Sequence, residues 1–276
     1  MKESDKNFSV GFIGGGNMAR SIIGGLVTDT TLNLAIQVYD PSSEMLDALK
    51  RDFAITIAES NQALTEQCDV VVLAVKPQAM KSVLTNIDAA KSKAVFLSIA
   101  AGLTINSLVK WLAIDTAIIR AMPNTPALVQ CGATGLFANA LVSSEQRNYA
   151  NIIINSTGIG LWVDSEDLLN TVTALSGSGP AYYFLVMEAM QAAAEKLGLD
   201  SETARQLTIQ TALGAATLAS QSQEDSSTLR KRVTSPGGTT EQAINTFMEN
   251  DLAAIFSKAM QAAYDRSKEL AIELDQ

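Results

Sequence analysis

Near its beginning the chain reads Val10-Gly11-Phe12-Ile13-Gly14-Gly15-Gly16-Asn17-Met18-Ala19. The apolar residues before Gly14 predict a short buried strand, and the residues after Ala19 continue at helical spacing. Between them, Gly14, Gly16 and Ala19 fill a G-x-G-x-x-A turn. Gly14 allows a tight turn, Gly16 lets a pyrophosphate lie against the backbone, and Ala19 lets the helix pack closely on the strand. Any tight turn between a strand and a helix favours glycine, but the flanking strand and helix indicate a nucleotide site whose helix start attracts phosphates.

The composition is that of an acidic globular protein. The chain has 276 residues, enough for one large domain or two ordinary ones, and 47% of them are hydrophobic. The net charge of −9 argues against a nucleic-acid or anionic-membrane partner, because such partners require a basic patch. Residues 1–6 lack the apolar core of a signal peptide, and no apolar run is long enough to span a membrane. We therefore expect a cytoplasmic protein.

The reactive side chains exclude several chemistries. No histidine occurs in the sequence, which excludes a histidine general base, a Ser–His triad and a histidine zinc site. Cys68 and Cys131 lie far apart without metal-ligand spacing, and we expect both to be core thiols of a reducing compartment. The sequence predicts no metal site.

Short apolar runs alternate with helical stretches over the first half of the chain, which predicts βαβ units and a parallel sheet. The expected strands after the first are residues 34–39, 54–57, 69–75, 94–99 and 117–120, with further edge strands at 133–138 and 160–163. Ligands of such sheets bind beyond the carboxyl ends of the strands. These ends are Asp40, Val75-Lys76-Pro77, Ala100-Ala101 and Met122-Pro123-Asn124.

Helical patterns dominate the second half. We predict an α/β protein with a Rossmann-type dinucleotide-binding domain at residues 1–164, followed by an all-helical domain at residues 165–276. The expected helices are residues 182–197, 201–220 with Ser201 as cap, 236–249 and 252–274. The first two are apolar on most faces, which favours burial in a subunit interface over a compact monomeric bundle.

Two glycine–proline stretches interrupt the helical half. They read Leu175-Ser176-Gly177-Ser178-Gly179-Pro180-Ala181-Tyr182 and Val233-Thr234-Ser235-Pro236-Gly237-Gly238-Thr239-Thr240. Each is predicted to place a serine cap and a proline before a helix start. Exposed N–H groups at the second stretch suit a carboxylate, and its threonine hydroxyls suit a second polar group. Two ordinary capped helices would look similar, but two such stretches beside a dinucleotide fold favour a substrate pocket.

Six motifs in a fixed order carry a resemblance to a known family. They are Gly14-Gly15-Gly16-Asn17-Met18-Ala19, Ala74-Val75-Lys76-Pro77, Ser98-Ile99-Ala100-Ala101-Gly102, Arg120-Ala121-Met122-Pro123-Asn124-Thr125-Pro126, Ser176-Gly177-Ser178-Gly179-Pro180-Ala181-Tyr182 and Ser235-Pro236-Gly237-Gly238-Thr239-Thr240. Over nearly its whole length the chain resembles the pyrroline-5-carboxylate reductases, which catalyse the last step of proline biosynthesis. The resemblance implies NADPH- or NADH-dependent reduction of 1-pyrroline-5-carboxylate, a cyclic imine, to L-proline. It also implies a homodimer through the helical half, with dimers assembling into larger rings, often decamers.

The resemblance also implies roles for particular residues. It places the cofactor on Gly14, Gly15, Gly16, Asn17 and Met18 (pyrophosphate), Ser42 and Asn61 (adenosine ribose), and Val75, Lys76, Pro77, Ala100 and Ala101 (nicotinamide). Asn124 is also expected to bind the cofactor. It places the substrate on Ser178, Pro180, Gly237, Gly238, Thr239 and Thr240, with the Thr240 hydroxyl as the catalytic group that meets the ring nitrogen. Since a protonated imine accepts hydride readily, the lack of histidine agrees with this reaction.

Two positions depart from the family pattern. Asp225-Ser226 stands where the family usually has His-Pro, so the contacts of that loop are open. Asp40 ends the second strand, where an acidic residue holds a ribose 2′-hydroxyl and repels a 2′-phosphate. It could equally cap the following turn, and Ser42 and Ser43 could hold a phosphate, so the preference for NADH or NADPH is open.

Two other functions remain alternatives. A β-hydroxyacid dehydrogenase shares the fold and the glycine turn, but that class uses a lysine at the start of its second domain, and this chain has none between Lys110 and Lys196. A non-catalytic dinucleotide-binding protein would not need Thr240 or the Ser-Pro-Gly-Gly turn.

Overall fold

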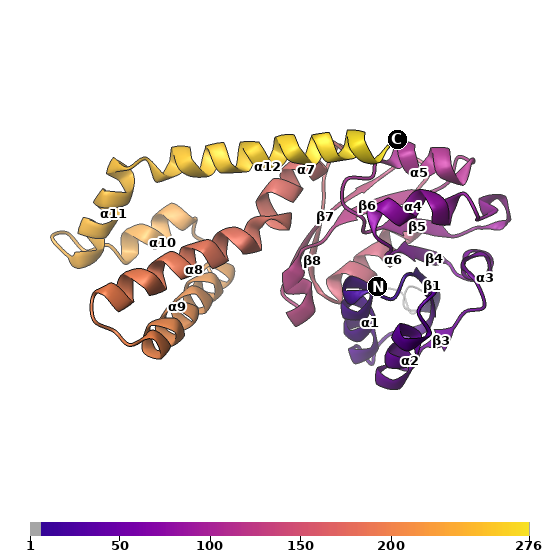
Figure 1. Ribbon diagram of the computed structural model, residues 1–276, viewed down its shortest axis with the longest axis horizontal. Coiled ribbons are helices and arrows are strands. Elements are labelled where there is room, and N and C mark those ends of the chain that lie inside the picture. Colours follow the sequence, from indigo (N-terminus) through magenta and orange to yellow (C-terminus); the bar gives the residue numbers. More distant parts are fainter. Residues whose placement is uncertain (1–6, 276) are drawn as a thin grey trace. The chain divides into compact units, whose positions relative to one another are not determined.

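The computed structural model describes residues 7–275 and divides them into two compact units (Figure 1). The first unit contains the described residues up to Ser178 and those from Ala263 onward, and the second contains Gly179–Ala262. The first is a sheet covered by helices and the second is helical, so the predicted fold class is confirmed. The domain boundary after residue 164 stays a prediction; by compactness the first unit extends to Ser178.

Within residues 7–275 the sheet has eight strands, in the order β3-β2-β1-β4-β5-β6-β7-β8. The strands are β1 (Asn7–Ile13), β2 (Asn33–Tyr39), β3 (Thr56–Ile57), β4 (Val70–Leu73), β5 (Val95–Ser98), β6 (Ile118–Met122), β7 (Gly132–Ala138) and β8 (Gly158–Trp162). Each predicted strand is therefore present. The order reverses between β1 and β4, and the first six strands are parallel.

The prediction for β7 is wrong in two respects. This strand is antiparallel to β6, and it lies between β6 and β8 instead of at the edge. The reason is the short connection after β6, which contains the 3₁₀ helix η3 (Thr125–Val129) and no crossover α-helix. A parallel partner requires a crossover of about a dozen residues or more. Helix α6 (Ser144–Asn155) provides one before β8, which pairs in parallel with β7.

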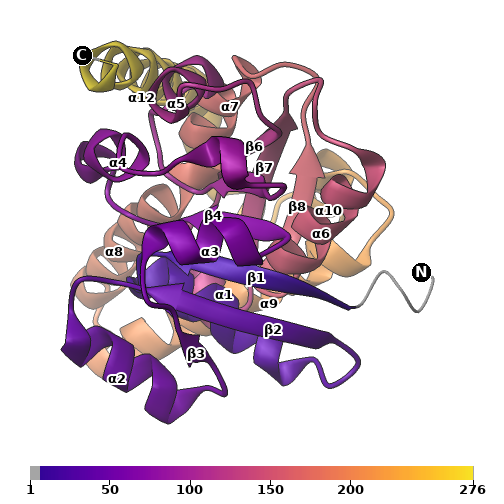
Figure 2. The ribbon, with the colours of Figure 1, turned by 90° about the vertical axis from the view of Figure 1, so that its right-hand side faces the viewer.

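Helices cover both faces of the sheet (Figure 2). One hydrophobic core joins α1 (Asn17–Thr28), α2 (Ser43–Asp52) and α6 to the sheet, and the other joins α3 (Asn61–Gln67), α4 (Pro77–Leu84) and α5 (Ile105–Leu112). β4 and β5 are buried at every position, as expected for parallel strands covered on both sides. This rigid sheet positions the loops at its carboxyl edge.

The two cysteines differ in their surroundings. Cys68 is buried in the second core, and burial together with the nearby Asp69 raises the pKa of its thiol to about 12. Cys131 is exposed, so the prediction that both are core thiols is wrong for this residue. It lies at the turn before β7, where the preceding Gln130 adopts a left-handed backbone conformation.

The second unit is helical. It contains α8 (Gly179–Lys196), α9 (Ser201–Gln221), α10 (Ser226–Arg232), α11 (Thr239–Glu249) and the first part of α12 (Leu252–Leu274). Asp200, and not Ser201 as predicted, caps α9, because the Asp200 carboxylate accepts the Thr203 N–H at 3.0 Å. Asp225 caps α10 in the same way at Thr228, and this hydrogen bond lowers the pKa of the Asp225 carboxyl.

The first glycine–proline stretch is not a capped helix start. Helix α7 (Leu168–Val172) continues through a π-helical turn, η4 (Thr173–Gly177), directly to α8. The Ser178 N–H donates to the Thr173 carbonyl at 2.8 Å, which is the i to i+5 bond of a π-helix. The Ser176 hydroxyl donates back to the Val172 carbonyl and caps nothing. Such π-turns occur frequently at functional sites.

The second stretch also lacks a serine cap. Gly238 is the N-cap of α11 and has no side-chain capping bond, and Ser235 contributes only its carbonyl, which accepts the Gly238 N–H at 3.0 Å. Over residues 7–275, the helices include none with the length and apolar character needed to cross a membrane.

Candidate active site

The glycine turn after β1 fits a pyrophosphate. Gly14 has a φ of +99°, and a Cβ there would lie 2.9 Å from the Ala74 carbonyl oxygen, so packing against the end of β4 requires glycine. A Cβ at Gly15 would lie 2.9 Å from the Leu49 side chain. A Cβ at Gly16, in contrast, would meet no atom within 4 Å. Gly16 is the N-cap of α1 without a side-chain partner, so its open space borders unoccupied helix N–H groups that suit a phosphate.

Asp40 joins this turn to the end of β2. Its Oδ2 accepts the Gly15 N–H at 2.8 Å, and its Oδ1 accepts the Ser42 N–H at 2.9 Å. The side chain thus performs the turn-capping role that the sequence left open, and it also places a negative charge beside the glycine turn. Each carboxylate oxygen can accept a second hydrogen bond, so Asp40 can still accept one from a ribose hydroxyl. That contact stays a prediction.

Replacing Asp40 by serine should raise the ratio of kcat/KM with NADPH to kcat/KM with NADH by up to about tenfold. The carboxylate and a 2′-phosphate repel one another by about 1–2 kcal/mol in a partly solvated cleft. The matched control is Asp47→Ser, because Asp47 is an exposed acid on the neighbouring helix α2. If Asp40→Ser leaves the ratio unchanged, Asp40 acts only as a turn residue.

Asn61 has an unused acceptor. It is the first residue of α3, and its side-chain Oδ1 is buried with no hydrogen-bond partner among the residues that the structure describes. A buried acceptor left unpaired is costly, and a ligand hydroxyl would satisfy it. Ser42, the other predicted ribose residue, is the N-cap of α2, where its hydroxyl accepts the Met45 N–H at 3.3 Å.

The loops after β4 and β5 complete the carboxyl edge of the sheet. Lys76 is the N-cap of α4, Pro77 is its first residue, and the Val75 side chain is half-buried beside them. After β5, the Ala100 N–H donates to the Ser98 hydroxyl at 3.4 Å, and Ala101 is exposed. The structure therefore brings the predicted cofactor residues of β1, β4 and β5 to one edge of the sheet.

The predicted substrate residues at the start of α11 form a separate group in the second unit. Gly237 has a φ of +72°, which favours glycine, and Thr239 and Thr240 are the first two residues of the helix. Both threonines are exposed, and the N–H groups of a first helical turn have no partner within the helix. This arrangement can accept a carboxylate at the N–H groups and offer the Thr240 hydroxyl to a second polar atom. Ser178, in the first unit, ends the π-turn described above, and Pro180 lies in the first turn of α8.

Comparison with known proteins identifies the family. Residues 166–270 match the family model described as pyrroline-5-carboxylate reductase dimerisation, and residues 9–102 match the model described as NADP oxidoreductase, coenzyme F420-dependent. The pyrroline-5-carboxylate reductase of Pseudomonas aeruginosa is 49% identical over 268 residues, which cover 97% of this chain and 98% of that protein. The chain belongs to the pyrroline-5-carboxylate reductase family.

Solved structures of the family agree with this. A pyrroline-5-carboxylate reductase from Coxiella burnetii superposes with a TM-score of 0.91 at 46% identity, covering 95% of this chain and 98% of that one. The Plasmodium falciparum pyrroline carboxylate reductase, solved with NADP bound, gives a TM-score of 0.82 at 31% identity, covering 96% of this chain and 99% of that one.

In this chain, Asn124 already has protein partners. It is buried, its Oδ1 accepts the Ala133 N–H at 2.9 Å, and its Nδ2 donates to the Ser176 carbonyl at 3.0 Å. The side chain ties the end of β6 to β7 and to the π-turn. Its predicted contact with the cofactor stays a prediction.

Sequence reasoning missed one side chain next to the substrate motif. The Gly237 N–H donates to the Glu241 Oε2 at 2.8 Å, so a carboxylate of this chain occupies one of the N–H groups predicted for the substrate. A glutamate at the third position of a helix commonly reaches back to a backbone N–H at the helix start, and this tendency could have identified Glu241. Among residues 7–275 no group of three or more aspartate, glutamate, cysteine or histidine side chains is arranged to hold a metal ion.

Proposed function

We propose that this chain reduces 1-pyrroline-5-carboxylate to L-proline with NADPH or NADH, the last step of proline biosynthesis. The observation that carries the proposal is the 49% identity to a pyrroline-5-carboxylate reductase over 97% of the chain. The open backbone at Gly16 and the exposed Thr240 at a glycine-rich helix start support it, because one suits the cofactor and the other the substrate.

The residues of this chain then have distinct tasks. When bound, the reduced nicotinamide supplies a hydride to the imine carbon. Gly16, Asn17 and Met18 would hold the pyrophosphate, and Asn61 the adenosine ribose. Gly14 and Gly15 would shape the turn, because their N–H groups already donate to the Tyr39 carbonyl and the Asp40 carboxylate. The first-turn N–H groups of α11 would hold the substrate carboxylate, and the Thr240 hydroxyl would hydrogen-bond the ring nitrogen. Because the imine nitrogen can arrive already protonated, the reaction needs no strong general acid, and the chain's main contribution is orientation.

The apolar helices of the second unit support a homodimer. In the single chain Tyr183 of α8 is 70% exposed, Leu185 is 65% exposed, and Leu218 of α9 is 66% exposed. Exposed apolar surface of this extent is typical of a subunit interface, and residues 166–270 match a dimerisation model. We propose that such dimers assemble further into a larger ring, with a decamer as the expected size, and that the protein is cytoplasmic.

Light scattering at micromolar concentration should show at least a dimer. Replacing both Leu185 and Leu218 by glutamate should shift the mass toward the monomer, because the charges would be buried in the interface. Leu141→Glu is the matched control, since Leu141 is an exposed leucine of the first unit. A monomeric wild type at this concentration would end the proposal.

The activity itself has a direct assay. When 1-pyrroline-5-carboxylate is added to the chain with NADPH or NADH, the absorbance of the reduced nicotinamide should fall. When a β-hydroxy acid is added with NADP⁺ or NAD⁺, this absorbance should not rise. Oxidation of the hydroxy acid would support the dehydrogenase alternative. Binding of NADPH without turnover of either substrate would support a non-catalytic dinucleotide-binding protein.

A further inference from the structure

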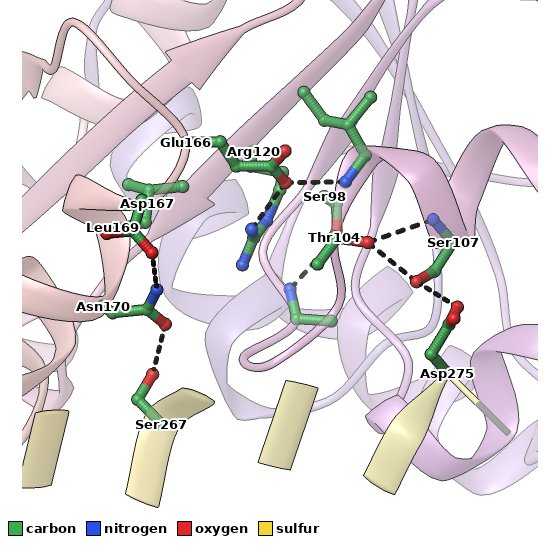
Figure 3. Close-up of polar contacts among 12 residues, drawn as sticks. Ser98, Thr104, Ser107, Arg120, Glu166, Asp167, Leu169, Asn170, Ser267 and Asp275 are labelled. Atoms are coloured by element: carbon green, nitrogen blue, oxygen red, sulfur yellow. Dashed lines mark hydrogen bonds and ion pairs between the residues drawn. The ribbon is translucent and has the colours of Figure 1, made fainter. Parts of the chain in front are cut away.

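A polar cluster lies beside the loop that connects β5 to α5. Figure 3 shows the Arg120 and Glu166 side chains pointing toward one another, and the Arg120 Nη1 lies 2.7 Å from the Glu166 Oε1. The same Oε1 accepts the N–H of Ile105, the first residue of α5, at 2.7 Å. One carboxylate oxygen therefore joins a strand and the end of this loop.

The ion pair is largely shielded from water. The Arg120 side chain is 13% exposed, that of Glu166 is 29% exposed, and the Arg120 Nε is buried without a partner. A charge-assisted hydrogen bond in such surroundings is short and strong, and the positive end of the α5 dipole adds to it. The Glu166 carboxylate is thus a rigid attachment point.

The end of the chain holds the loop from another side. A Cβ on Gly102, whose φ is +76°, would lie 2.9 Å from Leu274 of α12, and the Ser107 hydroxyl donates to the Asp275 Oδ1 at 2.6 Å (Figure 3). Thr104 caps α5 by accepting the Ser107 N–H at 3.1 Å. The loop Ile99–Thr104 is therefore fixed at its end by Glu166 and at its middle by α12.

This loop lies on the nicotinamide side of the sheet. A dinucleotide crosses such a sheet where the strand order reverses, here between β1 and β4, with its pyrophosphate at the start of α1. Asp40, Ser42 and Asn61 lie on the β2 and β3 side of that point, so the other half of the cofactor extends over the ends of β4 and β5. Ala100 and Ala101 follow the end of β5, in the loop Ile99–Thr104.

We propose that Glu166 is a positioning residue, which fixes the loop Ile99–Thr104 through the Ile105 N–H so that the loop is preformed for the nicotinamide half of the cofactor. The proposal rests on the proposed function, because it assumes an NAD(P)H site. Loss of the attachment lowers the fraction of molecules whose loop has the binding-competent conformation. The affinity for the cofactor falls in proportion to that fraction.

The test compares Glu166→Gln with Glu166→Ala, both in an Arg120→Met background. Neither double variant leaves a buried charge unpaired, and glutamine alone keeps an acceptor for the Ile105 N–H. We expect alanine to raise the Kd of NADPH, measured by fluorescence titration, about 5- to 10-fold, and glutamine to keep it within twofold of wild type. The Kd of 2′-phospho-ADP-ribose, which lacks the nicotinamide ring, should stay within twofold of the wild-type value in both double variants.

Hydrogen exchange gives a readout without ligand. Amides of residues 99–108 should exchange faster in the alanine double variant than in the glutamine one, and Asp88→Ala should change neither exchange there nor NADPH binding. Asp88 is the control because it forms an exposed ion pair with Lys91 in the same unit.

Equal Kd values for NADPH in the two double variants, or equal weakening of NADPH binding and 2′-phospho-ADP-ribose binding, would overturn the proposal. NADPH binding without reduction of the imine would overturn the proposed function and leave this inference standing.

Discussion

Replacing Thr240 by alanine should lower kcat about 10- to 100-fold while the Kd of NAD(P)H stays within twofold. The hydroxyl at the second position of α11 would orient the imine nitrogen, and one aligned hydrogen bond in the transition state contributes about 1–3 kcal/mol. Steady-state kinetics with 1-pyrroline-5-carboxylate, combined with a cofactor titration, measures both quantities.

Two further variants make the Thr240 test specific. Thr240→Ser keeps the hydroxyl and should recover most of the lost rate. Thr246→Ala removes an exposed threonine of the same helix, whose hydroxyl donates to the Gln242 carbonyl, and should leave kcat unchanged. An unchanged kcat in Thr240→Ala would remove Thr240 from the site.

Replacing Gly16 by valine should weaken NADPH binding about 100-fold or more while the melting temperature changes by only a few degrees. The side chain would enter the space where the pyrophosphate lies, and about two charge-assisted hydrogen bonds, at roughly 1.5–3 kcal/mol each, would be lost. A Cβ there would lie in open space, with no atom within 4 Å beyond its neighbours in the chain, so we expect the fold to tolerate the substitution. Fluorescence titration of NADPH and thermal unfolding measure the two effects.

Gly14 provides the contrast. Its φ is positive, and an added Cβ would lie only 2.9 Å from the Ala74 carbonyl oxygen, so Gly14→Ala strains the backbone itself. This variant should lower both the melting temperature and cofactor affinity. If Gly16→Val bound NADPH normally, the pyrophosphate would not lie against this turn.

The parts of the fold that local patterns specify were predictable. The glycine turn, the continuous apolar run of β4 and the helices α8, α9, α11 and α12 follow from spacing alone, whereas the short helix α10 was not predicted. The direction of β7 was not predictable from local patterns, because it depends on a connection that contains a short 3₁₀ helix in place of a crossover α-helix. The π-turn before α8 was mistaken for a capped helix start, since serine, glycine and proline suit both.

The candidate site divides in the same way. The sequence predicted different roles for Gly14 and Gly16, and the structure adds that a Cβ at Gly14 would crowd the Ala74 carbonyl oxygen whereas one at Gly16 would enter open space. The role of Asp40 as a link between two turns depends on a contact with Gly15, 25 residues away. Glu166 could not be predicted, because its partners Ile105 and Arg120 are 61 and 46 residues distant and no motif relates them.

The most direct test follows the hydride. The chain is supplied with 1-pyrroline-5-carboxylate and NADPH that carries deuterium at the transferable position of the nicotinamide, and the product is examined by mass spectrometry and NMR. The proposed function predicts L-proline with one deuterium at the former imine carbon, formed in equal amount to the NADPH oxidised. Oxidation of NADPH without labelled proline, or no oxidation with either cofactor, would contradict it.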